Sequence, residues 1–259
     1  KTAYEIKECD WSSDVCSSDL PDGNTLVIGS LTNLAQNAGF YAKSLKFDPV
    51  KDFIVLGIPV MFSYTLVTRK DFPLSTLNEI LAEGKAHPEK ITFGGGRGTG
   101  PGTAIAILSS MTGARFLEVP YRGAQAIYQD ILGGRLDIYF DNSSTARPFI
   151  DAGRVKAIIV SSKQRLPYHP DLPTVREAGY DFDQESWFGL FAPAKTPRPI
   201  VERLRTEMKK ITEDGEMRAF WEKSGGVPLN LTIAEQEKIV ADDARRWKKM
   251  IEDAGVTME

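Results

Sequence analysis

The residues best suited to bind a ligand form a glycine-rich run, GGGRGTGPG, at residues 94–102, between an expected strand and an expected helix. Glycines let the backbone turn tightly and present N–H groups at the positive end of the helix, which favours an anion. The run fits neither common nucleotide motif, because no register gives G-x-G-x-x-G and the lysine of G-x-x-x-x-G-K-[ST] is absent. An anion other than a nucleotide is therefore the favoured ligand; a connection that binds nothing is the alternative.

Polar residues also follow three other expected strands, at residues 30–33 (SLTN), 121–124 (YRGA) and 141–144 (DNSS). Tyr121 offers a hydroxyl and an aromatic face, and the small residues after it leave N–H groups of the next helix open. Ligands of open α/β sheets bind beyond the carboxyl ends of the strands. We therefore expect these segments and the glycine-rich run to surround one site.

Catalytic and metal-binding patterns are poor by comparison. His87 and His169 stand beside prolines in expected loops, and the motifs H-E-x-x-H and G-x-S-x-G are absent. We expect no catalytic residue, no metal and no cofactor. An α/β enzyme with Asp141 and Tyr121 as acid and base is a less favoured alternative.

The elements that must position these residues alternate between short β-rich runs and helices, a pattern typical of parallel sheets with helices on both faces. Ser75 is an expected N-cap, and Thr232 with Glu235 forms a capping-box pattern. The main expected strands are 25–30, 54–60, 64–69, 116–120, 135–140, 156–161 and 185–193, and the main expected helices are 75–86, 103–112, 124–132, 144–151 and 174–178, with a mostly helical chain from 197 onward.

The composition excludes several classes of protein. The 259 residues are 42% hydrophobic and 26% charged, unlike collagen-like, disordered or disulfide-rich chains. No stretch approaches the roughly 20 apolar residues that a membrane-spanning helix needs. The 32 basic and 35 acidic residues nearly balance, so we expect no nucleic-acid partner.

The first twenty residues differ from the rest, because they show no periodicity and contain both cysteines, Cys9 and Cys16. Codons for residues 1–6 and 9–20 reproduce the constant halves of a common short-read sequencing adapter, with an index of usual length between them. We interpret residues 1–20 as translated adapter and not native protein. They hold two lysines and five acidic residues, so the remainder has zero net charge. We expect a native start with a signal peptide to have been replaced.

The chain resembles the extracytoplasmic substrate-binding receptors of tripartite tricarboxylate transporters, the Bug receptors. The resemblance covers essentially all of 21–259 and is carried by PDGNTLVIGS (21–30), LKFDPVKDF (45–53), GGGRGTG (94–100), TGARFLEVPYRGAQAIYQDILGGRLDIYFDN (112–142), AGRVKAIIVSS (152–162), DLPTVREAGY (171–180) and WFGLFAPAKTP (187–197).

The resemblance implies an α/β, two-lobed periplasmic binding protein (Venus flytrap, type II), each lobe a mainly parallel sheet flanked by helices. The first lobe would comprise residues 21–65 and 188–259, with its N-terminal part missing, and the second lobe residues 66–187. The strands 64–69 and 186–192 would cross between the lobes.

By this resemblance, neutral donors would hold a small organic carboxylate. Asp141 would orient a water or an amine of the ligand. The family commonly carries Ser where this chain has Gly94 and His where it has Gly102, so the ligand need not be the citrate, glutamate or aspartate known for relatives. The expected ligand-binding residues are Ser30, Thr32 and Asn33 in the first lobe, and Gly96, Gly98, Thr99, Tyr121, Gly123, Ala124, Asp141 and Asn142 in the second.

The implied function is that of a periplasmic solute receptor. It would deliver its carboxylate by hinge closure to the membrane subunits of a tripartite tricarboxylate transporter, and it would act as a monomer. A ligand-binding sensor that signals to a membrane kinase is the alternative from another functional class.

Overall fold

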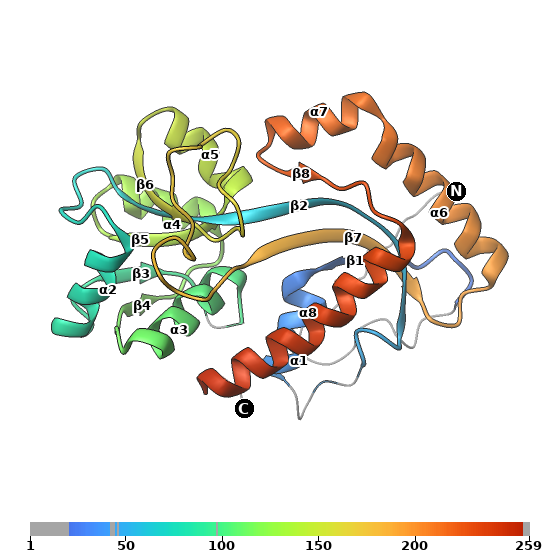
Figure 1. Ribbon diagram of the computed structural model, residues 1–259, viewed down its shortest axis with the longest axis horizontal. Helices are drawn as coiled ribbons and strands as arrows, with labels where there is room; N and C mark the ends of the chain where they lie inside the picture. The colour runs from blue at the N-terminus through green and yellow to red at the C-terminus, as the bar shows by residue number, and fades with distance from the viewer. Residues whose placement is uncertain (1–20, 42–44, 46, 97, 256–259) are drawn as a thin grey trace.

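Two lobes lie at opposite ends of the long axis of the molecule (Figure 1). The structure is a computed structural model that describes residues 21–41, 45, 47–96 and 98–255. The interpretation of residues 1–20 as adapter therefore concerns a segment outside the described residues. No helix among the described residues combines the length and the apolar character needed to span a bilayer.

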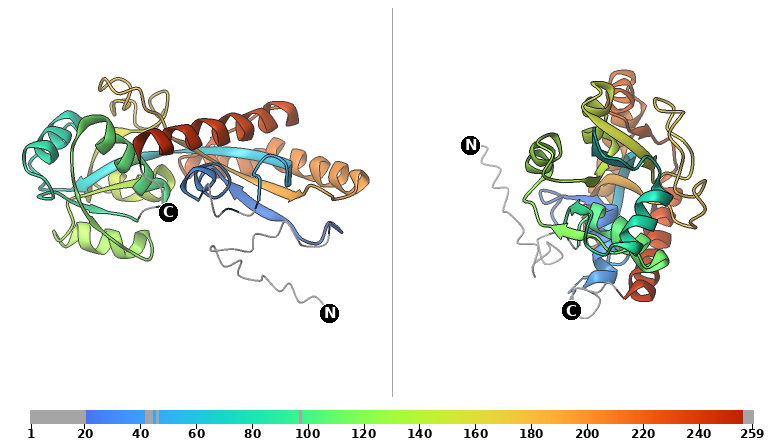
Figure 2. Two further views of the ribbon diagram at one scale, coloured as in Figure 1. Left: turned by 90° about the horizontal axis from the view of Figure 1, so that it is seen from below. Right: turned by 90° about the vertical axis from the view of Figure 1, so that its left-hand side faces the viewer.

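One long strand, β2 (Phe53–Arg69), runs through both lobes (Figures 1 and 2). Its first part pairs with β7 (Glu185–Pro193), and its last part pairs with β5 (Ile138–Asn142) and β6 (Val155–Val160). The sequence predicted two strands separated by residues 61–63, and this prediction is wrong. Those residues pair with residues 185–187 of β7, which satisfies their backbone groups without a turn.

The sheet of the first lobe contains β1 (Val27–Ser30), β7, β2 and the short β8 (Val227–Pro228), and every described pairing in it is antiparallel. The prediction of a mainly parallel sheet is therefore wrong for the described part of this lobe. β1 and β2 do run in the same direction, as strand–helix alternation implies. However, β7 returns from a distant part of the chain and inserts between them in the opposite direction.

The sheet of the second lobe is mixed. β3 (Thr92–Gly94) runs parallel to β4 (Leu117–Val119) and to β5, whereas β2 runs antiparallel to β5 and β6. Phe93 and Phe140 face the core under one pair of helices, and Val67 and Tyr139 face a second cluster on the other side. The first pair is α2 (Leu77–Ala86) and α3 (Gly100–Thr112), and the second is α4 (Ala124–Leu132) and α5 (Ser143–Asp151).

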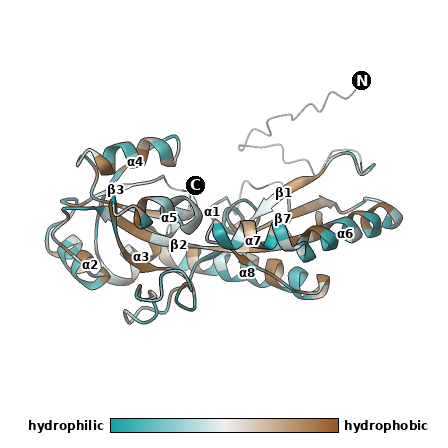
Figure 3. Ribbon diagram, turned by 90° about the horizontal axis from the view of Figure 1, so that it is seen from above, coloured by the Kyte–Doolittle hydropathy of each residue, from teal (hydrophilic) through white to brown (hydrophobic). Residues whose placement is uncertain are grey.

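Amphipathic helices cover the first-lobe sheet on two sides, and Figure 3 shows apolar strands beside helices of mixed polarity. The core against α8 includes Leu31, Phe191 and Trp247, whereas α6 packs over Leu56 and Ala192. The helical elements of this lobe are η2 (Leu31–Gln36), α1 (Asn37–Phe40), α6 (Arg198–Glu213), α7 (Gly215–Lys223) and α8 (Ile233–Ala254).

The structure confirms one predicted helix start and corrects two other helix predictions. The predicted capping box of Thr232 and Glu235 starts α8 as expected. The N-cap of α2 is Thr76 and not Ser75, because Thr76 accepts the amide of Glu79 while the Glu79 side chain bonds back. The predicted helix at 174–178 is only a turn, since a single turn is too short to be stable as a helix.

Arg147 of α5 joins the two lobes on the side of α7. Its Nη1 donates to the carbonyl oxygens of Glu222 and Lys223 at 3.0 Å each, where the last carbonyls of α7 need donors. Its guanidinium lies 4.3 Å from the ring centroid of Tyr168, whose hydroxyl donates to the Gly225 carbonyl at 2.8 Å. We call Arg147 and Tyr168 the interlobe clamp.

Replacing Arg147 with Met is expected to lower the free energy of unfolding by about 1–2 kcal/mol, because charged hydrogen bonds to the end of α7 are lost. Urea denaturation measures this change. Arg154→Met is the control, since the Arg154 guanidinium lies 5.8 Å from the Phe149 ring within the same lobe. Equal losses for both variants would show that the interlobe clamp contributes nothing specific.

Candidate functional site

The first-lobe candidates lie where β1 passes directly into η2. Ser30 and Asn33 form a capping box: the Ser30 amide donates to Asn33 Oδ1 at 2.6 Å, and the Asn33 amide donates to Ser30 Oγ at 3.3 Å. The side-chain Nδ2 of Asn33 donates to the Ile28 carbonyl. These two side chains therefore shape the turn, whereas Thr32 lies beside the phenol of Tyr64.

The glycine-rich loop connects β3 to α3 and holds its shape by local bonds. Thr99 is the N-cap of α3: its hydroxyl accepts the Gly102 amide at 3.2 Å and donates to the Gly96 carbonyl at 2.6 Å. Gly98 has a φ of +77°, which favours glycine. Pro101 lacks an N–H, so Gly100 provides the first amide at the positive end of the helix.

A second helix N-terminus stands at the end of β4. Gly123 is the N-cap of α4 with a φ of +146°, and open space surrounds the position of a Cβ there. The Tyr121 hydroxyl is already engaged, because it donates to Asp130 at 2.6 Å. Partial burial and the Asp130 carboxylate raise the pKa of Tyr121 to about 12, so this phenol remains neutral. The segment can offer a ligand the backbone amides at the start of α4, those of Gly123 and Ala124.

Asp141 lies near the end of β5, inside the second lobe and not on its surface. It is 3% exposed, and its carboxylate accepts the Tyr128 hydroxyl and the Asn142 amide at 2.8 Å each. Burial raises its pKa to about 6, although these donors and Tyr139 favour the charged form. Tyr121 and Asp141 thus have different hydrogen-bond partners within the second lobe.

Asn142 serves the helix that follows it. Its Oδ1 accepts the Ser144 amide at 3.0 Å and the Ser144 hydroxyl at 2.7 Å, which caps α5. Among the described residues, no group of three or more His, Cys, Asp or Glu side chains is placed to hold a metal ion.

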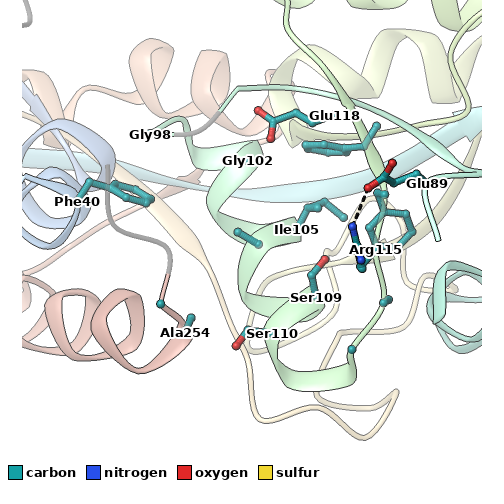
Figure 4. Close-up of a pocket in the computed structure, with 16 residues that line it drawn as sticks. Phe40, Glu89, Gly98, Gly102, Ile105, Ser109, Ser110, Arg115, Glu118 and Ala254 are labelled. Carbon is teal, nitrogen blue, oxygen red and sulfur yellow. Dashed lines mark hydrogen bonds and ion pairs between the residues drawn. The ribbon is translucent and has the colours of Figure 1, made fainter. Parts of the chain in front are cut away.

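A surface cavity of about 620 Å³ borders the glycine-rich loop (Figure 4). It lies between the outer side of α3 and Phe40 with the end of α8, and the Arg115–Glu89 ion pair lies at its far side. Gly98 is the one expected site residue among its described lining residues. The other expected residues therefore stand apart from this cavity.

Sequence motifs missed three residues at the junction of the lobes: Tyr64, Gln184 and Ser186. The Tyr64 phenol is buried, which raises its pKa, and Ser186, Thr32 and Gln184 act against this shift as hydrogen-bonding neighbours. In the sequence, Tyr64 is one more residue of an apolar strand, and Gln184 belongs to no motif. Only the tertiary contacts of Tyr64 and Gln184 with Gly100 connect them with the glycine-rich loop.

Gly102→Ala is expected to lower the free energy of unfolding by about 1–3 kcal/mol, because overpacking against a fixed group is costly. A Cβ at residue 102 would lie 2.1 Å from the Gly96 carbonyl oxygen. Gly96→Ala is the matched control, since its Cβ would meet only Thr99 Cγ2 at 3.8 Å. Thermal unfolding of both variants tests this, and an equal change in melting temperature would contradict the described loop geometry.

Asp141→Asn is expected to change how stability depends on pH. With a native pKa of about 6 against the ordinary value of 3.8, the native state binds a proton that the unfolded state does not bind between these values. The Asp141 contribution therefore stabilises the native state as pH falls, by about 1 kcal/mol from pH 7 to pH 5. Urea titrations at both pH values should show this gain in the parent and not in Asp141→Asn. Parallel pH dependences would refute the raised pKa.

Comparisons with known proteins agree on one family. A model described as "Tripartite tricarboxylate transporter family receptor" matches residues 12–256. The "UPF0065 protein in tcbD-tcbE intergenic region" of Pseudomonas sp. (strain P51) is 31% identical, over 92% of this chain and 71% of that protein.

Three solved structures confirm the two-lobed α/β fold. The R. palustris protein Rpa4515 with adipate has a TM-score of 0.83 at 25% identity, over 93% of this chain and 81% of that chain. MatC from Rhodopseudomonas palustris with bound malate has a TM-score of 0.82 at 27% identity, over 91% of this chain and 81% of that chain. The periplasmic binding protein BugD has a TM-score of 0.82 at 27% identity, over 93% of this chain and 81% of that chain. This chain belongs to the receptor family of the tripartite tricarboxylate transporters.

Proposed function

We propose that this protein is a periplasmic receptor that captures a small carboxylate between its lobes and delivers it to the membrane subunits of a tripartite tricarboxylate transporter. It acts as a monomer and catalyses no reaction. Family membership supports the transport role, and the neighbouring structures with adipate and malate support the ligand class.

The observation that carries the ligand class is the presence of two helix N-termini at the ends of adjacent parallel strands. α3 begins after β3 at the glycine-rich loop, and α4 begins after β4 at Gly123. Each presents backbone N–H groups at its positive end, which suits a carboxylate. A hydrogen bond to a charged group contributes about 1.5–3 kcal/mol, so a few neutral donors suffice.

The proposed division into lobes follows the partners of β2. Between Ser63 and Tyr64 this strand changes from β7 to β5, close to the proposed boundary between residues 65 and 66. The proposed ligand-binding residues lie on both sides of this point, with Thr32 on the first lobe and the two helix N-termini on the second. Closure of the lobes would enclose the ligand and present one closed form to the membrane subunits.

Thermal unfolding with di- and tricarboxylates tests this function. A ligand at about 100 times its Kd adds about 2.7 kcal/mol of stability, which corresponds to a rise of about 5–10 °C for a chain of this size. Succinate, malate, adipate and citrate are compared with 1,4-butanediol and 1,6-hexanediol, neutral analogues that lack the carboxylates. If no acid stabilises the protein, or if the diols act equally well, the proposed function is wrong.

A further inference from the structure

Four polar side chains from three elements and a connecting segment meet at the Tyr64 phenol, next to the start of α3. Thr32 comes from η2, Tyr64 from the middle of β2, Gln184 from the segment before β7, and Ser186 from β7. We call them the junction cluster. Three of them are buried, with exposed fractions of 6% for Tyr64, 0% for Gln184 and 1% for Ser186.

Tyr64 is held so that its hydroxyl faces the first turn of α3. Its backbone amide donates to Ser161 Oγ at 2.9 Å, and the Ser161 amide donates to the Tyr64 carbonyl at 2.8 Å. A Cβ placed on Gly100 would lie 2.1 Å from the Tyr64 hydroxyl oxygen. Glycine at residue 100 therefore makes room for this phenol beside the first residue of α3.

Gln184 contributes a buried acceptor that lacks a donor. Its Nε2 donates to the Gly100 carbonyl at 3.0 Å, which sets the orientation of the amide. Its Oε1 is buried and makes no hydrogen bond with the described residues. Buried acceptors are rarely left unpaired in native proteins. A bound molecule with a donor at this position would satisfy it.

The Gln184 amide is bonded to the first residue of α3, so a ligand donor that reaches Oε1 lies near the start of this helix. The same ligand can carry the carboxylate that a helix N-terminus attracts. Thr32 is on the first lobe and Gly100 is on the second, so closure of the lobes would bring these groups together around the ligand.

We propose that Tyr64 and Gln184 line the inner end of the ligand site and select a carboxylate that also carries a hydroxyl or ammonium donor. The Tyr64 hydroxyl donates to the ligand carboxylate, and Gln184 Oε1 accepts from the ligand donor. This inference rests on the proposed carboxylate-binding function and adds the chemical class of the ligand.

Calorimetric titration with malate and succinate tests the inference, because the two acids share one carbon chain and differ by a single hydroxyl. The parent protein should bind malate at least about tenfold more tightly, since a site built to bond a hydroxyl rejects the analogue without it. Gln184→Met should reduce this preference to less than about threefold. Tyr64→Phe should weaken both acids by about tenfold while the preference persists.

Two controls separate these effects from general damage. Gln129→Met removes an exposed amide on α4, and Tyr180→Phe removes a hydroxyl from a partly buried tyrosine packed on the core. Both should bind as the parent does, and thermal unfolding verifies that every variant is folded. Aspartate in place of malate extends the test to an ammonium donor.

The outcomes separate failure of the proposed function from failure of the inference alone. If the parent binds neither acid nor any other carboxylate, the proposed function fails and the inference fails with it. If the parent binds succinate as tightly as malate, or if folded Gln184→Met keeps the full preference for malate, the inference alone is overturned.

Discussion

The backbone pairing of β2 is the constraint on which the rest of the structure depends. Its peptide groups bond first to β7 and then to β5 and β6, so one continuous strand belongs to both sheets. Leaving a buried peptide group unpaired costs about 1–3 kcal/mol, and a shift of either sheet along β2 would break several bonds at once. The two lobes are therefore tied to a common register, and we expect relative motion to concentrate where the partners of β2 change.

This constraint explains why a site can be built from neutral groups. The helix N-termini of α3 and α4 are held at the ends of paired strands, so their amides are oriented before any ligand arrives. In a closed form without ligand, a buried lysine or arginine would be unpaired at a cost of several kcal/mol. An unpaired backbone amide costs less, about 1–3 kcal/mol. A receptor that must both bind and release its ligand benefits from this difference.

Local patterns predicted the elements well where the signal is local. The bounds of α4 and β7 are those predicted, because glycines flank the first and an apolar run with aromatic residues forms the second. The predictions of a break at residues 61–63 and of a mainly parallel first-lobe sheet were wrong, since both depend on β7, which is more than 100 residues away in the chain.

Of the expected site, the glycine-rich loop and Gly123 do present helix N-termini, whereas Tyr121, Asp141 and Asn142 have partners within the second lobe. Their binding roles stay predictions.

The sequence by itself determined the α/β class and the polar strand ends, and it predicted an anion held by neutral donors. These features follow from side-chain periodicity and from glycine chemistry over a few neighbouring residues. Only the tertiary structure decided that β7 separates β1 from β2 and that Tyr64 and Gln184 meet Gly100. The physical reason is that strand partners and buried polar contacts are selected by packing between distant segments, and no local pattern of residues encodes which segment will lie opposite.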